Sequence, residues 1–164
     1  MGARKLVTVV LVAVAVVLAA RYLFWNDKRD VRRRLFAMAE AASTSGRATA
    51  EERSSAAENL GALVTDDVII KTDSASFVGG RPAVVRLALD AAPAANTLRV
   101  SLEDVQVELI DPATATAFFT LNVSGAGSPA LDPLPRQVHA TLVKRRGEWL
   151  LERGEVLRTL EGAH

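Results

Sequence analysis

The stretch Leu98–Val123, LRVSLEDVQVELIDPATATAFFTLNV, carries the pattern that decides the fold of this chain. Apolar and polar residues alternate along it, which is the two-residue period of a strand with one buried face. The apolar phase slips by one residue at Glu103-Asp104, and a β-bulge is the simplest way to keep the same face buried. Asp111-Pro112 then makes a tight turn. We predict two long antiparallel strands, the first of them bent by a bulge.

Two more strands are expected on the C-terminal side. Residues 124–135 contain two glycines and three prolines and are predicted to form a loop. Val138, Ala140 and Leu142 continue the core face in the next strand. Arg146-Gly147 forms a hairpin turn into a last strand that runs from Trp149 to about Leu160. We expect Trp149 to be buried against the helices.

Helical patterns precede these strands. A first helix from Asp27, capped by Asn26 or Asp27, has one apolar stripe, formed by Val31, Leu35, Met38, Ala39 and Ala42. After a loop at 43–49, the capping box Thr49–Glu52 starts a second helix that reaches about Val64 and buries Ala57, Leu60 and Val64.

Residues 65–67 are then expected to turn the chain into a short strand at 68–70. A second short strand, Phe77-Val78, ends at Gly79-Gly80. A third helix has Pro82 in its first turn and ends at Pro93, with an apolar face formed by Val84, Val85, Leu87, Ala88 and Leu89. This order predicts the α+β class, with three helices against a strongly bent, mostly antiparallel sheet.

An apolar segment precedes the predicted domain. Leu6–Ala20, LVTVVLVAVAVVLAA, has Thr8 as its one polar residue, and Arg21-Tyr22-Leu23-Phe24-Trp25 follow as an aromatic belt. A helix from Leu6 to Trp25 would be about 30 Å long, close to the hydrocarbon thickness of a bilayer. We predict a transmembrane anchor at 1–25 and a domain at 26–164. A cleaved signal peptide and a buried helix of a soluble protein are the alternatives.

The orientation of the anchor depends on which cations are counted. A literal count of Lys and Arg beside the segment places the domain in the cytoplasm. The short basic start, Arg4-Lys5, is instead typical of a segment whose N-terminus stays inside the cell. We expect a single-pass protein of the cell membrane with an extracytoplasmic domain. The basic run at 28–34 could rest on anionic headgroups or form a solvated helix face.

Composition excludes several classes of protein. Residues 1–25 hold three cations and no acid, so the remaining 17 basic and 19 acidic residues give the domain a charge of −2. Such a domain lacks the basic surface that nucleic acid requires. The absence of cysteine excludes disulfides, thiolate metal sites and cysteine nucleophiles. Arg outnumbers Lys 16 to 4, which we interpret as a GC-rich, bacterial coding sequence.

Three stretches resemble the nuclear transport factor 2-like superfamily, in its SnoaL-like, polyketide-cyclase-like branch. They are residues 63–68 (LVTDDV) at a helix-to-strand junction, 77–84 (FVGGRPAV) at the start of the third helix, and 147–151 (GEWLL) at the start of the final strand. The likeness covers about residues 28–160. Together with the apolar segment, it resembles small membrane-anchored bacterial members of unassigned function. The family fold is a cone with a pocket, and its members include enzymes and domains with no known reaction, so fold does not give function.

This sequence lacks the combinations of catalytic residues that enzymes of this superfamily use. The isomerase pattern needs a tyrosine, but the one tyrosine is Tyr22 in the apolar segment. Dehydratase-like members use paired histidines, whereas this chain has His139 and the terminal His164. No spacing marks the Asp–Arg–Asp set of the epoxide hydrolases. The resemblance therefore implies no catalytic set in this chain.

A few side chains are weak site candidates. They are His139 in mid-strand, Asp104 and Glu108 beside the bulge, and Glu152 or Glu155, of which one would face inwards. Each of these is more simply explained as a solvated side chain on the exposed face of the sheet. Arg81, at the start of the third helix, is more simply explained as a residue that determines the fold than as one that binds a ligand. We expect no cofactor, and two histidines without cysteine give no metal site.

The predicted function is a non-catalytic, membrane-anchored domain. Its expected partners are membrane lipid through residues 6–25 and a small apolar ligand or a protein, and a homodimer is also compatible with the sequence. A cyclase-, isomerase- or dehydratase-type enzyme with a pocket acid or histidine is the first alternative. A structural subunit of an envelope complex is the second.

Overall fold

The computed structural model describes residues 14, 25–72, 77–94, 97–126 and 135–159. Within these ranges the chain forms three helices and six strands. The N-terminal helix covers residues 25–42, followed by α2 (Ala50–Ala62), β1 (Val64–Lys71), β2 (Phe77–Gly79), α3 (Arg81–Ala94), β3 (Thr97–Asp111), β4 (Thr114–Ala126), β5 (Arg136–Arg145) and β6 (Glu148–Thr159).

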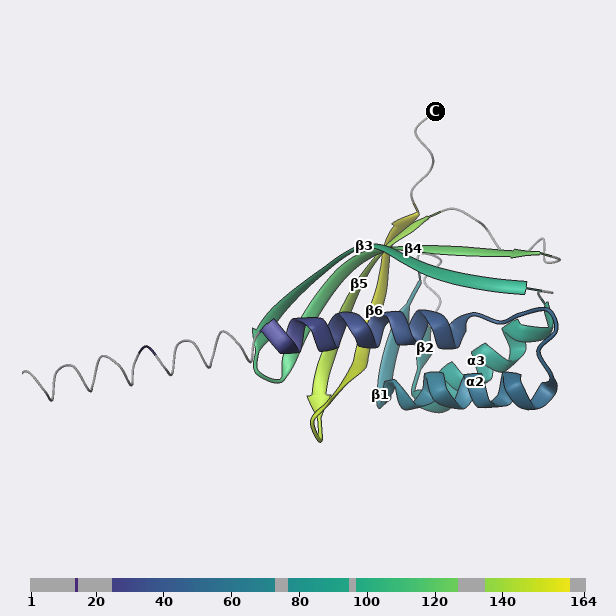
Figure 1. The fold of residues 1–164 in the computed structure, drawn as a ribbon, viewed down its shortest axis with the longest axis horizontal. Helices are drawn as coiled ribbons and strands as arrows, with labels where there is room; N and C mark the ends of the chain where they lie inside the picture. Colours follow the sequence, from purple (N-terminus) through teal and green to yellow (C-terminus); the bar gives the residue numbers. More distant parts are fainter. Residues whose placement is uncertain (1–13, 15–24, 73–76, 95–96, 127–134, 160–164) are drawn as a thin grey trace, which may run out of the picture.

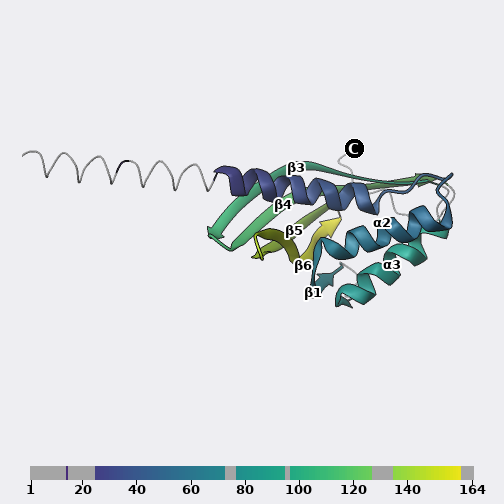
Figure 2. The same cartoon turned by 60° about the horizontal axis from the view of Figure 1, so that its bottom comes forward.

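The strands form one sheet in the order β2-β1-β6-β5-β4-β3. The β1–β6 pair is parallel and the other four pairs are antiparallel. The sheet curves over the N-terminal helix, while α2 and α3 lie together beneath the half that contains β1 (Figures 1 and 2). We call the face that the helices cover the inner face and the opposite one the outer face. This arrangement confirms the predicted α+β class and the bent, mostly antiparallel sheet.

The N-terminal helix packs its predicted stripe on the inner face. Val31 and Leu35 are almost fully buried and belong to the main core together with Trp149, Ala115 and Leu142. Burying such side chains stabilises the fold by about 1.5–3 kcal/mol each. The expected cap at Asn26 or Asp27 is wrong, because both residues lie inside the helix. Asp27 forms an ion pair with Lys144 instead.

The second helix starts as predicted but ends earlier. Thr49 and Glu52 form the reciprocal capping box at the start of α2. Val64, however, is the first residue of β1, so the turn expected at residues 65–67 lies within a strand. The register of β1 against β6 is irregular between Val64 and Ile69, and this irregularity accommodates the two exposed aspartates there.

The third helix packs on the second through Gly61. A Cβ at Gly61 would lie 2.6 Å from Cγ2 of Val85, so the close approach of α2 and α3 requires glycine. Val84 is buried as expected, but Leu87 and Leu89 are exposed, which corrects the predicted apolar face. The helix extends one residue past Pro93, because proline disturbs mainly the residues that precede it.

The predicted bulge in β3 is confirmed. The register against β4 shifts between Glu103 and Gln106, and Asp104 has a φ of 54°, which a residue with a side chain rarely adopts. The guanidinium of Arg32 donates to the carbonyl oxygen of Val105 at 2.7 Å. The bulge is therefore linked to the N-terminal helix.

The last hairpin also matches the prediction. Arg146 and Gly147 have positive φ values of 52° and 85°, as a tight two-residue turn requires. Trp149 is 2% exposed and belongs to the core that includes Val31 and Leu35.

The predicted anchor falls almost entirely outside the described residues. Only Val14 and Trp25 of the segment 6–25 are described. Among the residues that the structure places, no helix is both long and apolar enough to cross a bilayer.

Candidate functional site

An apolar cavity lies under the inner face of the sheet. Its volume is about 360 Å³, within the range of small-molecule sites. The N-terminal helix contributes Leu35, Met38 and Ala39, and α2 and α3 contribute Leu60, Val84 and Leu87. The strands supply the remaining wall, which includes Ile70, Leu102, Phe119, Leu121, Val138, Ala140, Leu151 and Gly154. These side chains can contact an apolar molecule but offer it no hydrogen bond.

Two charged residues, Lys71 and Glu155, also border the cavity. Lys71 pairs with Glu155 in the register of β1 and β6, next to the pair Ile70 and Gly154. Because successive side chains of a strand point to opposite faces, the inward direction of Ile70 places the side chains of Lys71 and Glu155 on the outer face. They therefore meet the cavity through their backbone.

The outer face carries a row of three titratable groups, His139, Glu155 and Lys71. Cross-strand pairing joins Phe118, His139, Glu155 and Lys71 in one row across β4, β5, β6 and β1. The rings of Phe118 and His139 are stacked, with centroids 4.4 Å apart and an angle of 15° between the planes. His139 thus lies where alternation along its strand predicts, on the face opposite Val138 and Ala140.

A second hollow surrounds the bulge. This open groove of about 760 Å³ is bordered by Asp104 and Gln106 of the bulge, Arg32 and Phe36 of the N-terminal helix, and Phe118 and Leu157. Phe36, Phe118 and Leu157 are each close to half exposed. The groove thus places the carboxylate-bearing bulge beside three exposed apolar side chains.

The other acidic candidates lie away from the cavity. A bulge separates the pairs Thr141–Arg153 and Leu142–Leu151, so Glu152 falls between them. The Glu152 carboxylate is 3.9 Å from the guanidinium of Arg145. Glu108 is exposed. Of the four carboxylates considered, Asp104 alone borders the groove at the bulge.

Arg81 joins the start of α3 to the start of β1. Its guanidinium donates to the carbonyl oxygen of Val64 at 3.0 Å and is 3.2 Å from the carboxylate of Asp66. These contacts attach the third helix to the sheet, as expected of a residue that determines the fold.

The described residues contain no cluster of three side chains that could hold a metal ion. Among the titratable groups of the described ranges, a clear pKa shift is found at Asp111, in the β3–β4 turn. The backbone N–H of Ala113 donates to its carboxylate at 2.7 Å, and with a smaller contribution from Thr114 this lowers the pKa of Asp111. This carboxylate belongs to the turn and lies in neither hollow.

Sequence comparison finds no relative, whereas comparison of structures finds many. Neither a protein-family model nor a curated protein matches the chain. A candidate scytalone dehydratase from Novosphingobium aromaticivorans superposes with a TM-score of 0.70 at 17% identity, covering 86% of this chain and 89% of its own. The chain has the nuclear transport factor 2-like fold. The resemblance noted in the sequence is confirmed at the level of the fold.

Two further solved structures share this fold. A nuclear transport factor 2-like protein with a cystatin-like fold, also from Novosphingobium aromaticivorans, has a TM-score of 0.68 at 22% identity, covering 85% of this chain and 88% of its own. A candidate dehydratase of the same family from Streptomyces avermitilis has a TM-score of 0.65 at 20% identity, covering 83% and 98%. At such identities the likeness concerns the fold and not the reaction.

Sequence reasoning did not find the whole cavity. Ile70, Val84 and Leu87 were assigned to helix and strand faces without a hollow between them. Gly154 gave the one available signal, because a glycine inside a strand often marks a place where something must approach the backbone closely. A Cβ there would have Ile70 Cγ1 as its nearest neighbour, at 4.0 Å, so Gly154 borders open space.

Proposed function

We propose that this chain is a membrane-anchored domain that binds a small apolar ligand in the cavity under its sheet, without catalysing a reaction on it. The observation that carries the proposal is the lining of that cavity, whose side chains are aliphatic or aromatic. A hollow of about 360 Å³ with such walls, open to solvent beside the exposed Leu87, favours an apolar occupant over water, because water needs polar partners.

We propose that the domain does not catalyse a reaction, because its candidate acid–base side chains lie away from the cavity. A general acid or base must come within hydrogen-bond reach of the atom that it protonates or deprotonates. The register directs His139 and Glu155 to the outer face, and the ion pair with Arg145 holds Glu152 near the last hairpin. Within the described residues, a ligand in the cavity would therefore meet no side chain suited to proton transfer.

An enzyme of the dehydratase or cyclase type is the alternative. The groove at the bulge favours it, since Asp104 is held there at a positive φ beside Phe36 and Phe118. Strained residues are often found at functional sites. Such an enzyme would bind its substrate in the groove and use Asp104 as acid or base.

The cavity can be tested with naphthalene as a probe, on the full chain in lipid nanodiscs with labelled methyl groups. We expect naphthalene to shift the methyl resonances of Ile70, Val84 and Leu151 in a saturable way. Gly154→Leu should abolish these shifts because its side chain fills the cavity, whereas Thr141→Leu adds an apolar group to the outer face and should retain them. Methyl resonances that do not respond to naphthalene would refute the apolar site.

The anchor is the second part of the proposal. Residues 6–25 are apolar with an aromatic end, and we propose that they hold the domain at the cell membrane, on its extracytoplasmic side. The full-length protein should stay in the membrane pellet after a carbonate wash. Soluble protein of unchanged mass would contradict the anchor, and soluble protein lacking about 20 N-terminal residues would indicate a cleaved signal.

A further inference from the structure

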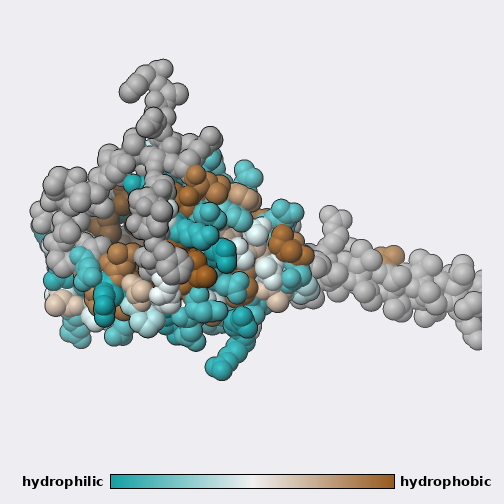
Figure 3. Space-filling view, turned by 180° about the vertical axis from the view of Figure 1, so that it is seen from behind, coloured by the Kyte–Doolittle hydropathy of each residue, from teal (hydrophilic) through white to brown (hydrophobic). Residues whose placement is uncertain are grey.

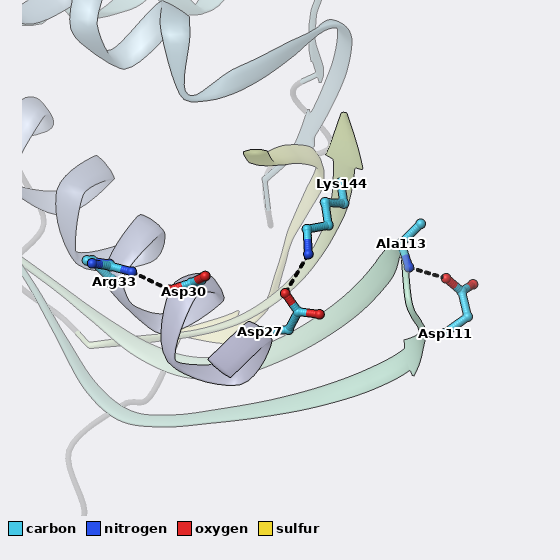
Figure 4. A network of polar contacts seen from close by, with 6 residues as sticks. All are labelled: Asp27, Asp30, Arg33, Asp111, Ala113 and Lys144. Carbon is cyan, nitrogen blue, oxygen red and sulfur yellow. Dashed lines mark hydrogen bonds and ion pairs between the residues drawn. The ribbon is translucent and has the colours of Figure 1, made fainter. Parts of the chain in front are cut away.

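Three segments that are distant in sequence meet where the chain enters the domain. The carboxylate of Asp27, near the start of the described helix, is 2.6 Å from Nζ of Lys144, at the end of β5. The backbone N–H of Lys144 donates to the carbonyl oxygen of Ala113, in the β3–β4 turn, at 2.7 Å. Figure 4 shows these groups side by side. We define residues 25–34, 110–113 and 144–148 as the basic end of the domain.

Charge is unevenly divided between the basic end and the rest of the domain. The basic end holds eight basic residues (Lys28, Arg29, Arg32, Arg33, Arg34, Lys144, Arg145 and Arg146) and four acidic ones (Asp27, Asp30, Asp111 and Glu148). The remainder of residues 26–164 holds 9 basic and 15 acidic residues. A domain of charge −2 therefore carries +4 at the end where the chain enters and −6 elsewhere.

The acidic residues of the basic end are already engaged. Asp27 pairs with Lys144, Asp30 with Arg33, and Glu148 with Arg34 at 3.5 Å. Asp111 accepts the backbone N–H of Ala113. Lys28, Arg29 and Arg146 are exposed, and no acidic side chain within the described residues forms an ion pair with them. Arg146 borders a hollow that Asp66 and Asp67 also line. These three cations are available to an anionic partner.

The same end exposes apolar side chains. Trp25 is 69% exposed and Ile110 is 60% exposed, which makes them the two most exposed large apolar residues in the described part of the chain. Tryptophan beside Lys and Arg is typical of protein segments at the level of lipid headgroups. On the face seen from behind, the apolar side chains that are visible are interspersed with polar ones (Figure 3).

We propose that the basic end binds the anionic phospholipid headgroups of the membrane in which the chain is anchored. The inference rests on the proposed anchor. If residues 6–24 lie in the bilayer, Trp25 is at its surface, and the described helix begins there beside the β3–β4 turn (Figure 1). Lys28 and Arg29 are three and four residues past Trp25, or about 6 Å along the helix at most, so they then lie within one Debye length, ~10 Å, of the headgroups. Arg146 lies in the β5–β6 turn, which the ion pair of Lys144 with Asp27 joins to the same helix. Attraction at this end and repulsion of the acidic remainder orient the domain on the membrane.

The absence of cysteine allows this to be tested on the full chain by a single fluorescent label. Ala113→Cys places the label in the β3–β4 turn, and Ser45→Cys places it in the loop at the other end of the helix, as the control. The protein is reconstituted in nanodiscs with nitroxide-headgroup lipid, in phosphatidylcholine with or without phosphatidylglycerol. We expect phosphatidylglycerol to increase quenching at position 113 by about threefold and to leave position 45 unchanged.

Charge variants decide whether the three cations cause this effect. Lys28→Gln, Arg29→Gln and Arg146→Asn together should abolish the dependence on phosphatidylglycerol; asparagine is chosen at 146 because it tolerates a positive φ. The matched control replaces three exposed arginines outside the basic end, Arg47, Arg86 and Arg99, with Gln and should retain the dependence.

Two results would overturn the inference, and they differ in what else they exclude. In the first, the protein inserts into the discs, but quenching at position 113 is the same with and without phosphatidylglycerol, or both triple variants respond equally to phosphatidylglycerol. That result refutes lipid binding by the basic end and leaves the anchor intact. Protein that does not associate with the discs refutes the anchor and this inference together.

Discussion

The two faces of strands β4 and β5 differ sharply although they share the same backbone. On the inner face, Ala115, Ala117 and Leu142 have no exposed surface. On the outer face, the residues between them are partly or largely exposed, and Phe118 remains 47% exposed. The inner face is thus built for packing and for an apolar cavity, and the outer face carries His139, Glu155 and the hydroxyls.

This comparison explains why candidate residues of plausible chemistry do not form a site. A strand reverses the direction of its side chains at each residue, so a polar residue between two core residues is directed away from the core. Bulges are the exception, because they change the phase. In this chain the bulges place Asp104 beside a groove and Glu152 near Arg145.

The largest effect is expected from Trp149→Ala on the inner side. Trp149 is 2% exposed and packs with Val31 and Leu35, so its loss should cost about 3–5 kcal/mol of unfolding free energy through lost transfer energy and a cavity. His139→Ala, on the outer face, is the comparison and should cost about 1 kcal/mol or less. Urea unfolding followed by far-ultraviolet circular dichroism measures both. Equal losses would show that the assignment of the two faces is wrong.

A smaller effect is expected where the N-terminal helix joins the sheet. The ion pair between Asp27 and Lys144 is partly buried, with 15% and 30% of the side chains exposed. Asp27→Asn should lower the unfolding free energy by about 1–2 kcal/mol, between the values typical of exposed and buried pairs. Asp30→Asn, which removes an exposed pair with Arg33, is the matched control and should change little. A loss as large as that of Trp149→Ala would mean that the pair, and not the apolar stripe, holds the helix.

The stacked rings on the outer face should contribute less still. Phe118 and His139 stack at 4.4 Å, and a double-mutant cycle with Phe118→Ala and His139→Ala should give a coupling of about 0.5–1 kcal/mol. Additive losses would show that the stack contributes nothing to stability.

The smallest effect is expected from Asp111→Asn in the β3–β4 turn. The pKa of Asp111 lies below its usual value of 3.8, since the Ala113 N–H and Thr114 stabilise the carboxylate in the folded state. Its contribution is therefore fully present above pH 3.8 and is lost as the pH falls through the lowered pKa. Wild type should be slightly more stable than the variant at neutral pH, and the difference should vanish in acid. A difference that grows in acid would contradict the assigned direction.

Local patterns predicted much of the fold correctly. The capping box Thr49–Glu52, the turn at Arg146-Gly147 and the bulge at Glu103-Asp104 all depend on residues close together in the chain. The predictions were wrong where the conformation or contact of a residue depends on a partner that is distant in the sequence. Val64 joined a strand because β6 lies beside it, and Asp27 became an ion-pair partner because Lys144 lies within reach.

The sequence by itself determined which residues of the N-terminal helix, β4 and β5 face the core, because the two-residue period of strands and the stripe of a helix are local properties of the chain. It also determined the absence of cysteine chemistry. Only the tertiary structure decided that Ile70, Val84 and Gly154 border one cavity, and that Asp27 meets Lys144 where the chain enters the domain. Both groupings join residues from separate elements, and their positions depend on how the sheet bends over the helices, which no local pattern specifies.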